Sequence, residues 1–302
     1  MKRVMLIRND QAGVPRKQST ELKIQKILRR HYDEVHVKEE GEHSHDAAKR
    51  ACENDYDTVV VYGGDGTIDE VVAVLSEYEK RPKLAILPGG TFNMVARIMG
   101  LPMNPVAAIR KINFHKTVPM HVGRANDRVF TFILSTGPIS KEIHDVPRAE
   151  KKKYGALAYM VNILKVLPKM RSHEIRLTTE DLDYVGGASN MLFILNQAFL
   201  TFRKNIFRKD DPAGLLFVAK GSSVTIALPA LAKILAKGTA HTEDLILERT
   251  ESFRYEANEL KEFDVDGDLG GEAPIEVEIL KNHLEIFVPK RWNPFSFLRG
   301  KK

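Results

Sequence analysis

Hydrophobic and polar positions divide the chain into two regions of different character. In the first third, short runs rich in β-branched residues alternate with segments whose apolar residues recur at helical spacing. The pattern predicts strands over 4–7, 35–37, 58–62 and 83–87. It predicts helices over 21–30, 46–54, 68–78 and 92–100. This alternation is typical of a parallel sheet covered by helices.

After about residue 117, strand-like runs separated by turns dominate the chain. They are predicted over 121–124, 128–134, 174–178, 191–195, 215–218, 243–249, 253–257, 275–279 and 283–288. Helical patterns interrupt them over 154–170 and 230–237. We therefore predict an α/β domain over 1–120, a β-rich, mainly antiparallel domain over 121–289 and a basic aromatic tail over 290–302.

Composition and charge narrow the class of partner. The 302 residues carry a net charge of +6 and a pI of about 9.2, which favours nucleotides, nucleic acid or anionic lipid surfaces. Cys52 is the one cysteine, so no intrachain disulfide can form and a reducing compartment fits. The N-terminus has no secretory pattern, and no run reaches the roughly 18 apolar residues of a spanning helix. A cytoplasmic location is expected.

The segment GGDGT, from Gly63 to Thr67, follows the apolar run TVVVY and precedes a helical pattern. Glycines let backbone approach oxygen atoms closely, and the positive end of the next helix favours an anion. The segment therefore predicts a phosphate-binding loop, although it matches neither a P-loop nor a dinucleotide fingerprint. Thr67 and Glu70 could also simply form a capping box.

Two further segments also follow predicted strands. GGTFN, at 89–93, repeats the order of strand, glycine loop and helix, and NDQAG, at 9–13, follows the first strand. Loops at neighbouring strand ends of an open α/β sheet converge on one crevice. For 9–13, an ordinary surface turn is an equal alternative.

Together these segments resemble the diacylglycerol kinase-like lipid kinase family, which is related in fold to NAD kinases. NDQAG, GGDGTIDE and GGTFN correspond to its first three motifs, and FDVDGDLGGEAPIEVEILKNHLEIFVP resembles its closing segment. The likeness runs from about Val4 to Pro289. It implies an N-terminal α/β nucleotide-binding domain and a C-terminal β-sandwich-like domain, with ATP and Mg²⁺ as cofactors.

The resemblance also implies roles for individual residues. It places contacts to ATP at Asn9, Gly13, Gly64, Asp65, Gly66, Thr67, Glu70 and Thr91. It places the general base at Asp268, where the family usually has Glu, and Asp266 is the competing candidate. A carboxylate suits this role because it can accept the proton of an attacking hydroxyl. Taken alone, this Asp-Gly-Asp segment reads as a hairpin turn.

Some positions depart from the family pattern. FRKDDPAGLLFV resembles the place where bacterial members hold a structural magnesium through Asp-Gly-Leu, but Ala213 stands where that Asp is expected. A metal there would need Asp211, together with Leu215. Asp10 and Met94 also replace usual residues, and an Asp usual in the second domain has no counterpart in STGPISKEI.

A kinase that acts on a lipid must reach a membrane surface, and three segments could touch it. They are the basic amphipathic stretch at 148–171, the apolar stretch at 228–238 and the tail at 290–302. The alternative is that the helices pack on their own domain and that the tail is disordered. We predict peripheral membrane association, a lipid substrate and no nucleic acid, with a homodimer left open.

The leading hypothesis is an ATP-dependent lipid kinase that phosphorylates diacylglycerol or a similar lipid. A second hypothesis is a nucleotide- or lipid-binding regulator without catalysis, suggested by Met94 and Ala213. A third is an NAD kinase-like enzyme, which would share the glycine loop but act on a soluble acceptor.

Overall fold

The computed structural model describes residues 1–8, 18–90, 93–136, 171–199, 212–220, 240–241, 243 and 245–290. The chain divides into two compact units. The first unit comprises Met1–Val122 and Asn282–Asn293, and the second unit includes Gly123–Lys281.

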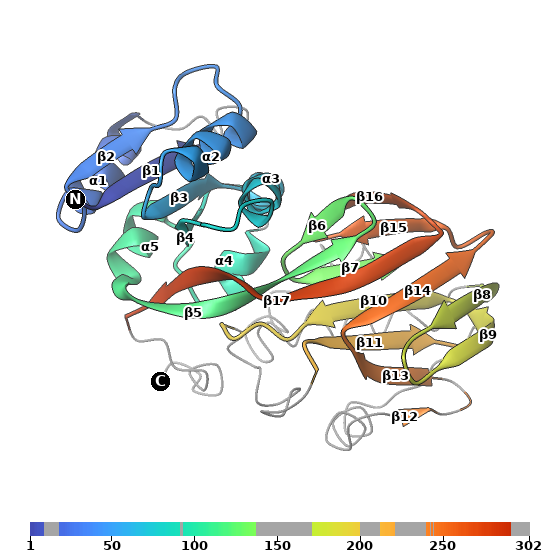
Figure 1. The fold of residues 1–302 in the computed structure, drawn as a ribbon. Helices are drawn as coiled ribbons and strands as arrows, with labels where there is room; N and C mark the ends of the chain where they lie inside the picture. The colour runs from blue at the N-terminus through green and yellow to red at the C-terminus, as the bar shows by residue number, and fades with distance from the viewer. Residues whose placement is uncertain are drawn as a thin grey trace, which may run out of the picture. The chain divides into compact units, whose positions relative to one another are not determined.

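A parallel sheet forms the centre of the first unit (Figure 1). Its strands are β1 (Arg3–Arg8), β2 (Glu34–Val37), β3 (Thr58–Gly63) and β4 (Lys83–Pro88), in the order β2-β1-β3-β4. Every residue of β3 is buried, as expected of a strand covered on both faces. These four strands confirm the first region predicted from the sequence.

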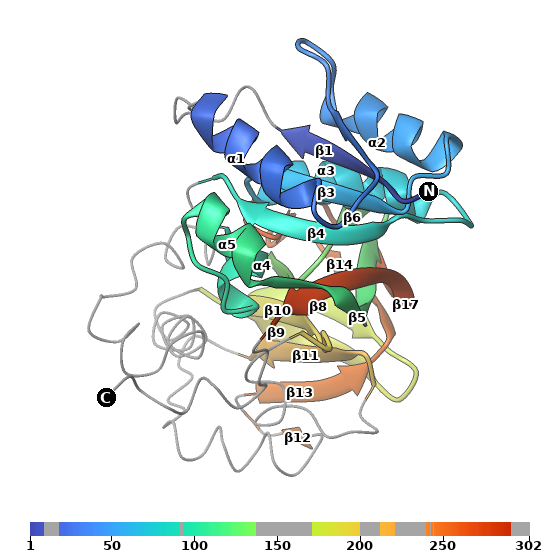
Figure 2. The same cartoon turned by 90° about the vertical axis from the view of Figure 1, so that its left-hand side faces the viewer.

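Helices cover both faces of this sheet (Figure 2). They are α1 (Gln18–Leu28), α2 (Ser44–Glu53), α3 (Asp65–Ser76), α4 (Met94–Ile98) and α5 (Pro105–Lys111). Right-handed crossovers from β1 to β2 and from β2 to β3 run in opposite directions, so they place α1 and α2 on opposite faces. Helix α5 packs with α1, and α3 packs with α2.

Helix α5 was not predicted, although its start carries a clear signal. Asn104 accepts a hydrogen bond from the Ala107 N–H at 3.0 Å, and Pro105 occupies the first helical position. The helix is short, so its apolar pattern alone does not distinguish it from a loop.

Two long strands, β5 (Ile112–Ala125) and β17 (Ile275–Pro289), take part in both units. The sequence predicted separate strands at 275–279 and 283–288, but a single strand continues through the polar residues between them. There, the Asn282 N–H donates to His121 Nδ1 at 3.0 Å. From Asn282 onward the chain belongs to the first unit, where β17 runs parallel to β4. The sequence had assigned all of 121–289 to one domain.

The second unit contains two antiparallel sheets. One has the order β17-β14-β8-β9 and the other β12-β13-β11-β10-β7-β15-β16. The remaining strands are β6 (Arg128–Phe130), β7 (Ile133–Thr136), β8 (His173–Thr178), β9 (Asp183–Ala188), β10 (Asn190–Leu195), β11 (Gly214–Ala219), β12 (Ala240–His241), β13 (Leu245–Thr250), β14 (Ser252–Ala257), β15 (Glu262–Val265) and β16 (Asp268–Glu272).

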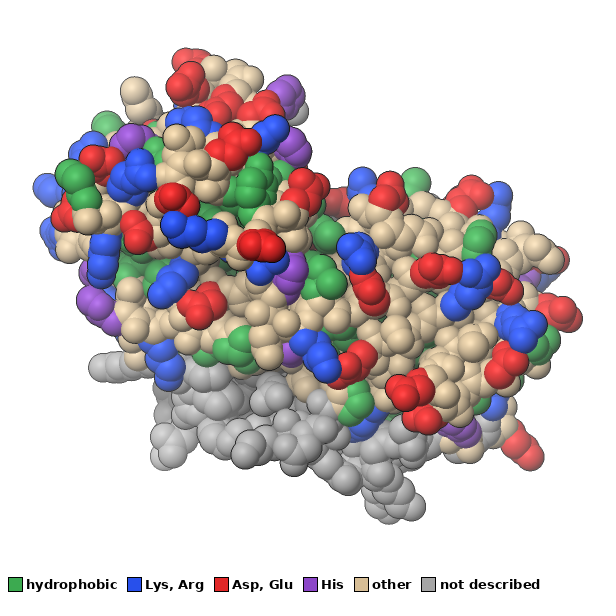
Figure 3. All heavy atoms as spheres, viewed as in Figure 1, with side chains coloured by type: hydrophobic (Ala, Val, Ile, Leu, Met, Phe, Trp, Pro, Cys, Tyr) green, Lys and Arg blue, Asp and Glu red, His purple; other side chains and the backbone are tan. Residues whose placement is uncertain are grey.

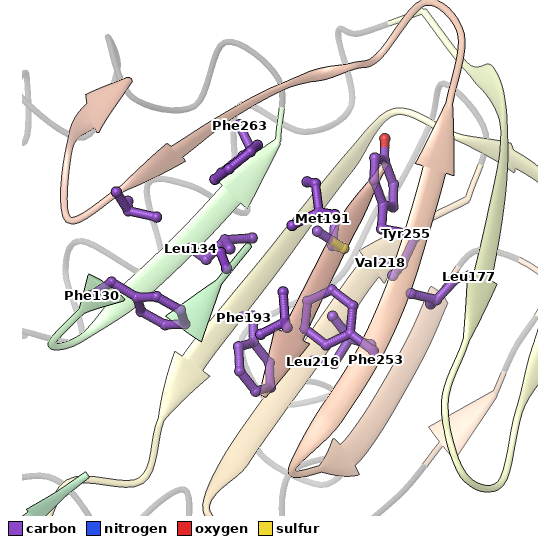
Figure 4. Close-up of a cluster of buried hydrophobic side chains, with 14 of the residues drawn as sticks. Phe130, Leu134, Leu177, Met191, Phe193, Leu216, Val218, Phe253, Tyr255 and Phe263 are labelled. Atoms are coloured by element: carbon purple, nitrogen blue, oxygen red, sulfur yellow. The ribbon is translucent and has the colours of Figure 1, made fainter. Parts of the chain in front are cut away.

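The hydrophobic core of the second unit lies between its sheets (Figure 4). Alternate residues of β10, Met191 and Phe193, face Phe253 and Tyr255 of β14, and the rings of Phe193 and Phe253 lie 4.9 Å apart. Burial raises the pKa of Tyr255 to about 12, and its hydroxyl donates to the Leu260 carbonyl at 2.6 Å. This core, enclosed by two sheets, confirms the predicted β-sandwich-like fold.

The helical patterns at 154–170 and 230–237 and nearly all of the tail at 290–302 lie outside the described residues. Among the helices that the structure describes, none combines the length and the apolar character needed to cross a membrane.

Candidate functional site

The first glycine loop joins β3 to α3. Gly64 is the N-cap of α3 in an extended conformation, with φ −87° and ψ −177°, and no side chain caps the helix there. The first helical hydrogen bond runs from the Ile68 N–H to the Gly64 carbonyl at 3.1 Å. The first N–H groups of a helix have no intrahelical partner and carry its positive dipole end, so this turn can hold phosphate oxygens.

The second glycine loop follows β4 and packs directly against the first. The Gly89 N–H donates to the Gly63 carbonyl at 2.8 Å. A Cβ atom added at Gly90 would lie 2.5 Å from the Gly64 Cα, and one added at Gly64 would lie 3.2 Å from the Gly90 Cα. Backbone packs on backbone here, so both positions need glycine for packing as well as for any phosphate. The predicted convergence of these two loops is confirmed.

Polar side chains hold the second loop in place. Asn93 is left-handed, with φ 51°, and its Oδ1 accepts from the Gly89 and Gly90 N–H groups at 3.0 and 2.8 Å. Asp65 Oδ1 accepts from the Met94 N–H at the start of α4 at 2.6 Å. The observed role of Asp65 is thus to join the loops, and its contact with ATP stays a prediction.

The alternative reading of Thr67 and Glu70 as a capping box is wrong. Glycine at position 64 begins the helix earlier than expected, so Thr67 lies within the first turn, where it is buried. Its side chain fills the space that a Cβ of Gly63 would need. Glu70 is exposed and accepts from the His45 N–H at 3.1 Å, so it contacts the first turn of α2 instead.

The strand register aligns the ends of β1, β3 and β4 at one edge of the sheet. Arg8 pairs with Tyr62, and Gly63 pairs with Pro88. The segment 9–13 follows β1 at this edge, but Asn9, Gly13 and Thr91 lie outside the described residues. The predicted contacts of these three residues with ATP remain predictions, as does that of Gly66, which is exposed in the first turn of α3.

In the second unit, Asp266 and Gly267 form the turn between β15 and β16. Their φ values of 51° and 98° are both positive, as a two-residue type I′ hairpin requires. The Asp266 carboxylate accepts from the N–H groups of Thr131, Phe132 and Ile133 at 2.5, 3.0 and 2.8 Å, and from the Thr131 hydroxyl at 2.8 Å. These hydrogen bonds stabilise an interruption between β6 and β7, so the single strand predicted at 128–134 is in fact two strands.

Asp268 has different surroundings from Asp266. It is the first residue of β16, it is exposed, and no described residue donates to its carboxylate. The neighbouring Leu269 is 66% exposed. Of the two candidate bases, Asp266 has its oxygens engaged by four donors, whereas Asp268 presents its carboxylate to solvent.

The predicted metal position falls partly outside the described residues. Leu215 is buried in β11 between β10 and β13, Ala213 is also buried, and Asp211 is not described. Across the part of the chain that the structure describes, no three His, Cys, Asp or Glu side chains gather in a group that could hold a metal ion. Magnesium at Asp211 and Leu215 stays a prediction.

Comparisons with known proteins agree with this arrangement. Residues 3–125, which include both glycine loops, match the family model described as "Diacylglycerol kinase catalytic domain". The chain is 31% identical over 291 residues to a Streptococcus pneumoniae protein named "Putative lipid kinase", covering 95% of this chain and 98% of that protein. It is 30% identical over 247 residues to a diacylglycerol kinase of Staphylococcus epidermidis, covering 80% and 78% of the two chains.

A solved structure shares the fold. The crystal structure described as "a putative diacylglycerol kinase from Bacillus anthracis str. Sterne" superposes with a TM-score of 0.72 and 26% sequence identity. The match covers 97% of this chain and 98% of that chain, so it extends over both units.

Proposed function

The chain belongs to the diacylglycerol kinase-like lipid kinase family, and on that basis we propose that it transfers the γ-phosphate of ATP to a hydroxyl of a membrane lipid such as diacylglycerol. The observation that carries this proposal is the contact between Gly64 and Gly90, which brings two glycine loops together at the ends of adjacent parallel strands. Such an edge is where open α/β sheets bind ligands.

In this proposal the phosphates of ATP contact the backbone N–H groups at the start of α3. Side chains are absent at Gly64 and Gly90, so oxygens can approach the main chain closely. Mg²⁺, when bound, neutralises charge on the transferring phosphate. We propose that ATP oxygens and water supply most of its ligands.

Asp268 is the general base that we propose. As the lipid hydroxyl oxygen forms a bond to the γ-phosphorus, Asp268 accepts the hydroxyl proton, and the bond from the γ-phosphorus to the bridging oxygen breaks to release ADP. Support for Asp268 over Asp266 comes from the four donors that already occupy Asp266. The exposed side chain of Leu269 beside Asp268 also suits an apolar substrate.

We further propose that the protein works in the cytoplasm, at a membrane surface. A lipid with a hydroxyl headgroup and long acyl chains stays in the bilayer, so a kinase that acts on it must bind there reversibly. The three segments that the sequence singled out for this contact lie almost wholly outside the described residues and remain predictions.

Incubation of the full chain with γ-labelled ATP, Mg²⁺ and vesicles of total lipid extract tests this proposal. Label is expected in the lipid fraction after chromatography, and α-labelled ATP, which cannot pass label with the γ-phosphate, serves as the control. In a parallel reaction, NAD replaces the lipid. Labelled NADP would favour an NAD kinase-like enzyme, and thermal stabilisation by ATP without labelled product would favour a regulator.

A further inference from the structure

The solvent-facing side of α1 and of the turn after it carries only basic charge. Ile24 and Leu28 bury the opposite side of the helix. Residues three, four and seven positions apart share one side of a helix, so the exposed cations lie together with Leu22, which is 56% exposed. These cations, which we call the basic face, are Lys23, Lys26, Arg29 and Arg30.

Two histidines and Lys290 adjoin the basic face. The ring of His31 lies 6.2 Å from that of His115. The Lys290 N–H donates to the Lys111 carbonyl at 2.6 Å, at the end of α5, which packs with α1. The pKa of His31 is lowered, first by burial and then by the positive charges of His115, Lys290 and Arg30. The sequence continues from Lys290 into the tail with its Trp, two Phe and further basic residues.

No carboxylate of the described residues neutralises the basic face. Among the described residues, none of its four cations forms a salt bridge, and Arg29 donates instead to the neutral Gln25 at 3.2 Å. The acidic residue in the first turn of α1, Glu21, is paired with Arg8 at 3.0 Å. Within the part of the chain that the structure describes, the positive charge of this surface is therefore available to an external anion.

Exposed cations without salt bridges are not a general feature of the chain, as the outer surface of the second unit shows. There, acidic and basic side chains are interspersed across β14 and β17 (Figure 3). The salt bridges of this sheet surface join Arg124 to Glu278, Arg176 to Asp183, Arg254 to Glu256 and Glu276, and Lys281 to Glu251. That sheet surface balances its own charge, whereas the basic face does not.

We propose that the basic face docks the protein on the anionic surface of a lipid bilayer. This inference rests on the proposed function, since a kinase whose substrate lies in the bilayer needs such contact. The charge suits anionic headgroups, and Leu22 among the cations adds an apolar side chain that can enter the interface. A nucleic acid would also be attracted by the charge, but the lipid substrate favours the bilayer.

Vesicle binding by the full chain, measured by co-sedimentation without ATP, tests the docking surface. Binding is expected to equimolar phosphatidylglycerol and phosphatidylcholine, to be absent with phosphatidylcholine alone, and to weaken as salt rises. Each cation near an anionic surface is worth about fivefold in binding, so Lys26→Gln with Arg30→Gln should lose roughly 25-fold.

A matched control removes the same net charge elsewhere. Arg176→Gln with Lys281→Gln removes two exposed cations whose charge is already paired with Asp183 and Glu251, and its vesicle binding should stay near that of the unmodified chain. An equal loss in both double variants would assign the effect to net charge and overturn the inference. An unchanged affinity after Lys26→Gln with Arg30→Gln would overturn it as well.

Two further measurements distinguish bilayer docking from nucleic-acid binding and from catalysis. If random-sequence duplex DNA binds more tightly than the anionic vesicles at the same salt, and the Lys26 and Arg30 changes weaken that binding, the surface binds nucleic acid instead.

A short-chain, water-soluble diacylglycerol separates docking from catalysis, because the Lys26 and Arg30 changes should lower the ratio of the rate with vesicles to the rate with the soluble substrate. If neither substrate is phosphorylated while vesicle binding still depends on Lys26 and Arg30, the proposed function fails and the docking inference stands.

Discussion

The glycine loops of the first unit and the Asp266–Gly267 turn of the second unit hold candidate site residues in opposite ways. The loops depend on missing side chains, because Gly64 and Gly90 meet backbone to backbone. The turn depends on one side chain, since the Asp266 carboxylate receives four hydrogen bonds. In the loops, the residues that pack together are therefore also those that we propose to bind phosphate. In the turn, Asp266 holds the structure and Asp268 is the general base that we propose, so mutation can test the two roles separately.

The largest expected effect is on turnover, from Asp268→Asn. An amide cannot accept the hydroxyl proton, so kcat should fall by about 10²- to 10⁴-fold. The exposed position of Asp268 predicts that the melting temperature and stabilisation by ATP stay unchanged. Initial rates with labelled ATP and thermal shift measure these quantities, and a kcat equal to that of the unmodified chain would remove Asp268 from the mechanism.

The companion substitution, Asp266→Asn, should act mainly on stability. Asparagine tolerates the positive φ of this turn, so the change isolates the loss of a charged acceptor for the N–H groups of Thr131, Phe132 and Ile133. Hydrogen bonds to charged groups are worth more than neutral ones, and we expect a loss of about 3 kcal/mol in the free energy of unfolding. Urea unfolding measures it. Unaltered stability with abolished turnover would reverse the roles of Asp266 and Asp268.

In the glycine loops, one substitution should affect both properties. Gly90→Ala places a methyl group against the Gly64 backbone and should cost about 1–3 kcal/mol of stability while weakening ATP binding. Gly41→Ala is the control, because Gly41 has φ +80° but nothing within 4 Å of its added Cβ. That variant should lose about 1 kcal/mol from backbone strain and keep its thermal shift with ATP. If the thermal shift of Gly90→Ala with ATP equals that of the unmodified chain, packing and phosphate binding do not depend on the same residue.

The smallest expected effect is on the pH dependence of stability. It identifies the pH range in which variants of the glycine loops and of the Asp266–Gly267 turn should be compared. Because the pKa of His31 is lowered from its ordinary value of 6.5, the folded chain binds fewer protons there than the unfolded chain. His31 thus contributes stability above pH 6.5 that is lost as pH falls through its lowered pKa. His31→Gln should lose less stability than the unmodified chain on acidification, as melting temperatures would record. Parallel pH profiles for the two proteins would contradict this.

Local patterns in the sequence predicted much of the first unit. Buried β-branched runs such as TVVVY predicted the parallel strands, and glycines after two of them predicted loops that meet. The sequence alone explained only part of why glycine is needed at positions 64 and 90. Sequence reasoning assigned them to phosphate binding, whereas their mutual contact depends on the register between β3 and β4, which no single segment encodes.

Predictions that depended on distant partners were less successful. The run 128–134 reads as one strand, but it breaks because Asp266, far along the chain, binds the N–H groups in its middle. Likewise, the capping box failed because Gly64 begins the helix and Glu70 contacts α2. The short strands β9, β15 and β16 were missed because glycines and charged residues interrupt their apolar alternation.

The path of β17 has a consequence for biosynthesis. In the sheet of the first unit, β4 has β3 on one side and the last part of β17 on the other. A nascent chain therefore carries an open edge at β4 during translation of the whole second unit, although domains usually fold in the order in which they emerge from the ribosome. Only when the residues after Asn282 have left the exit tunnel can this edge be covered.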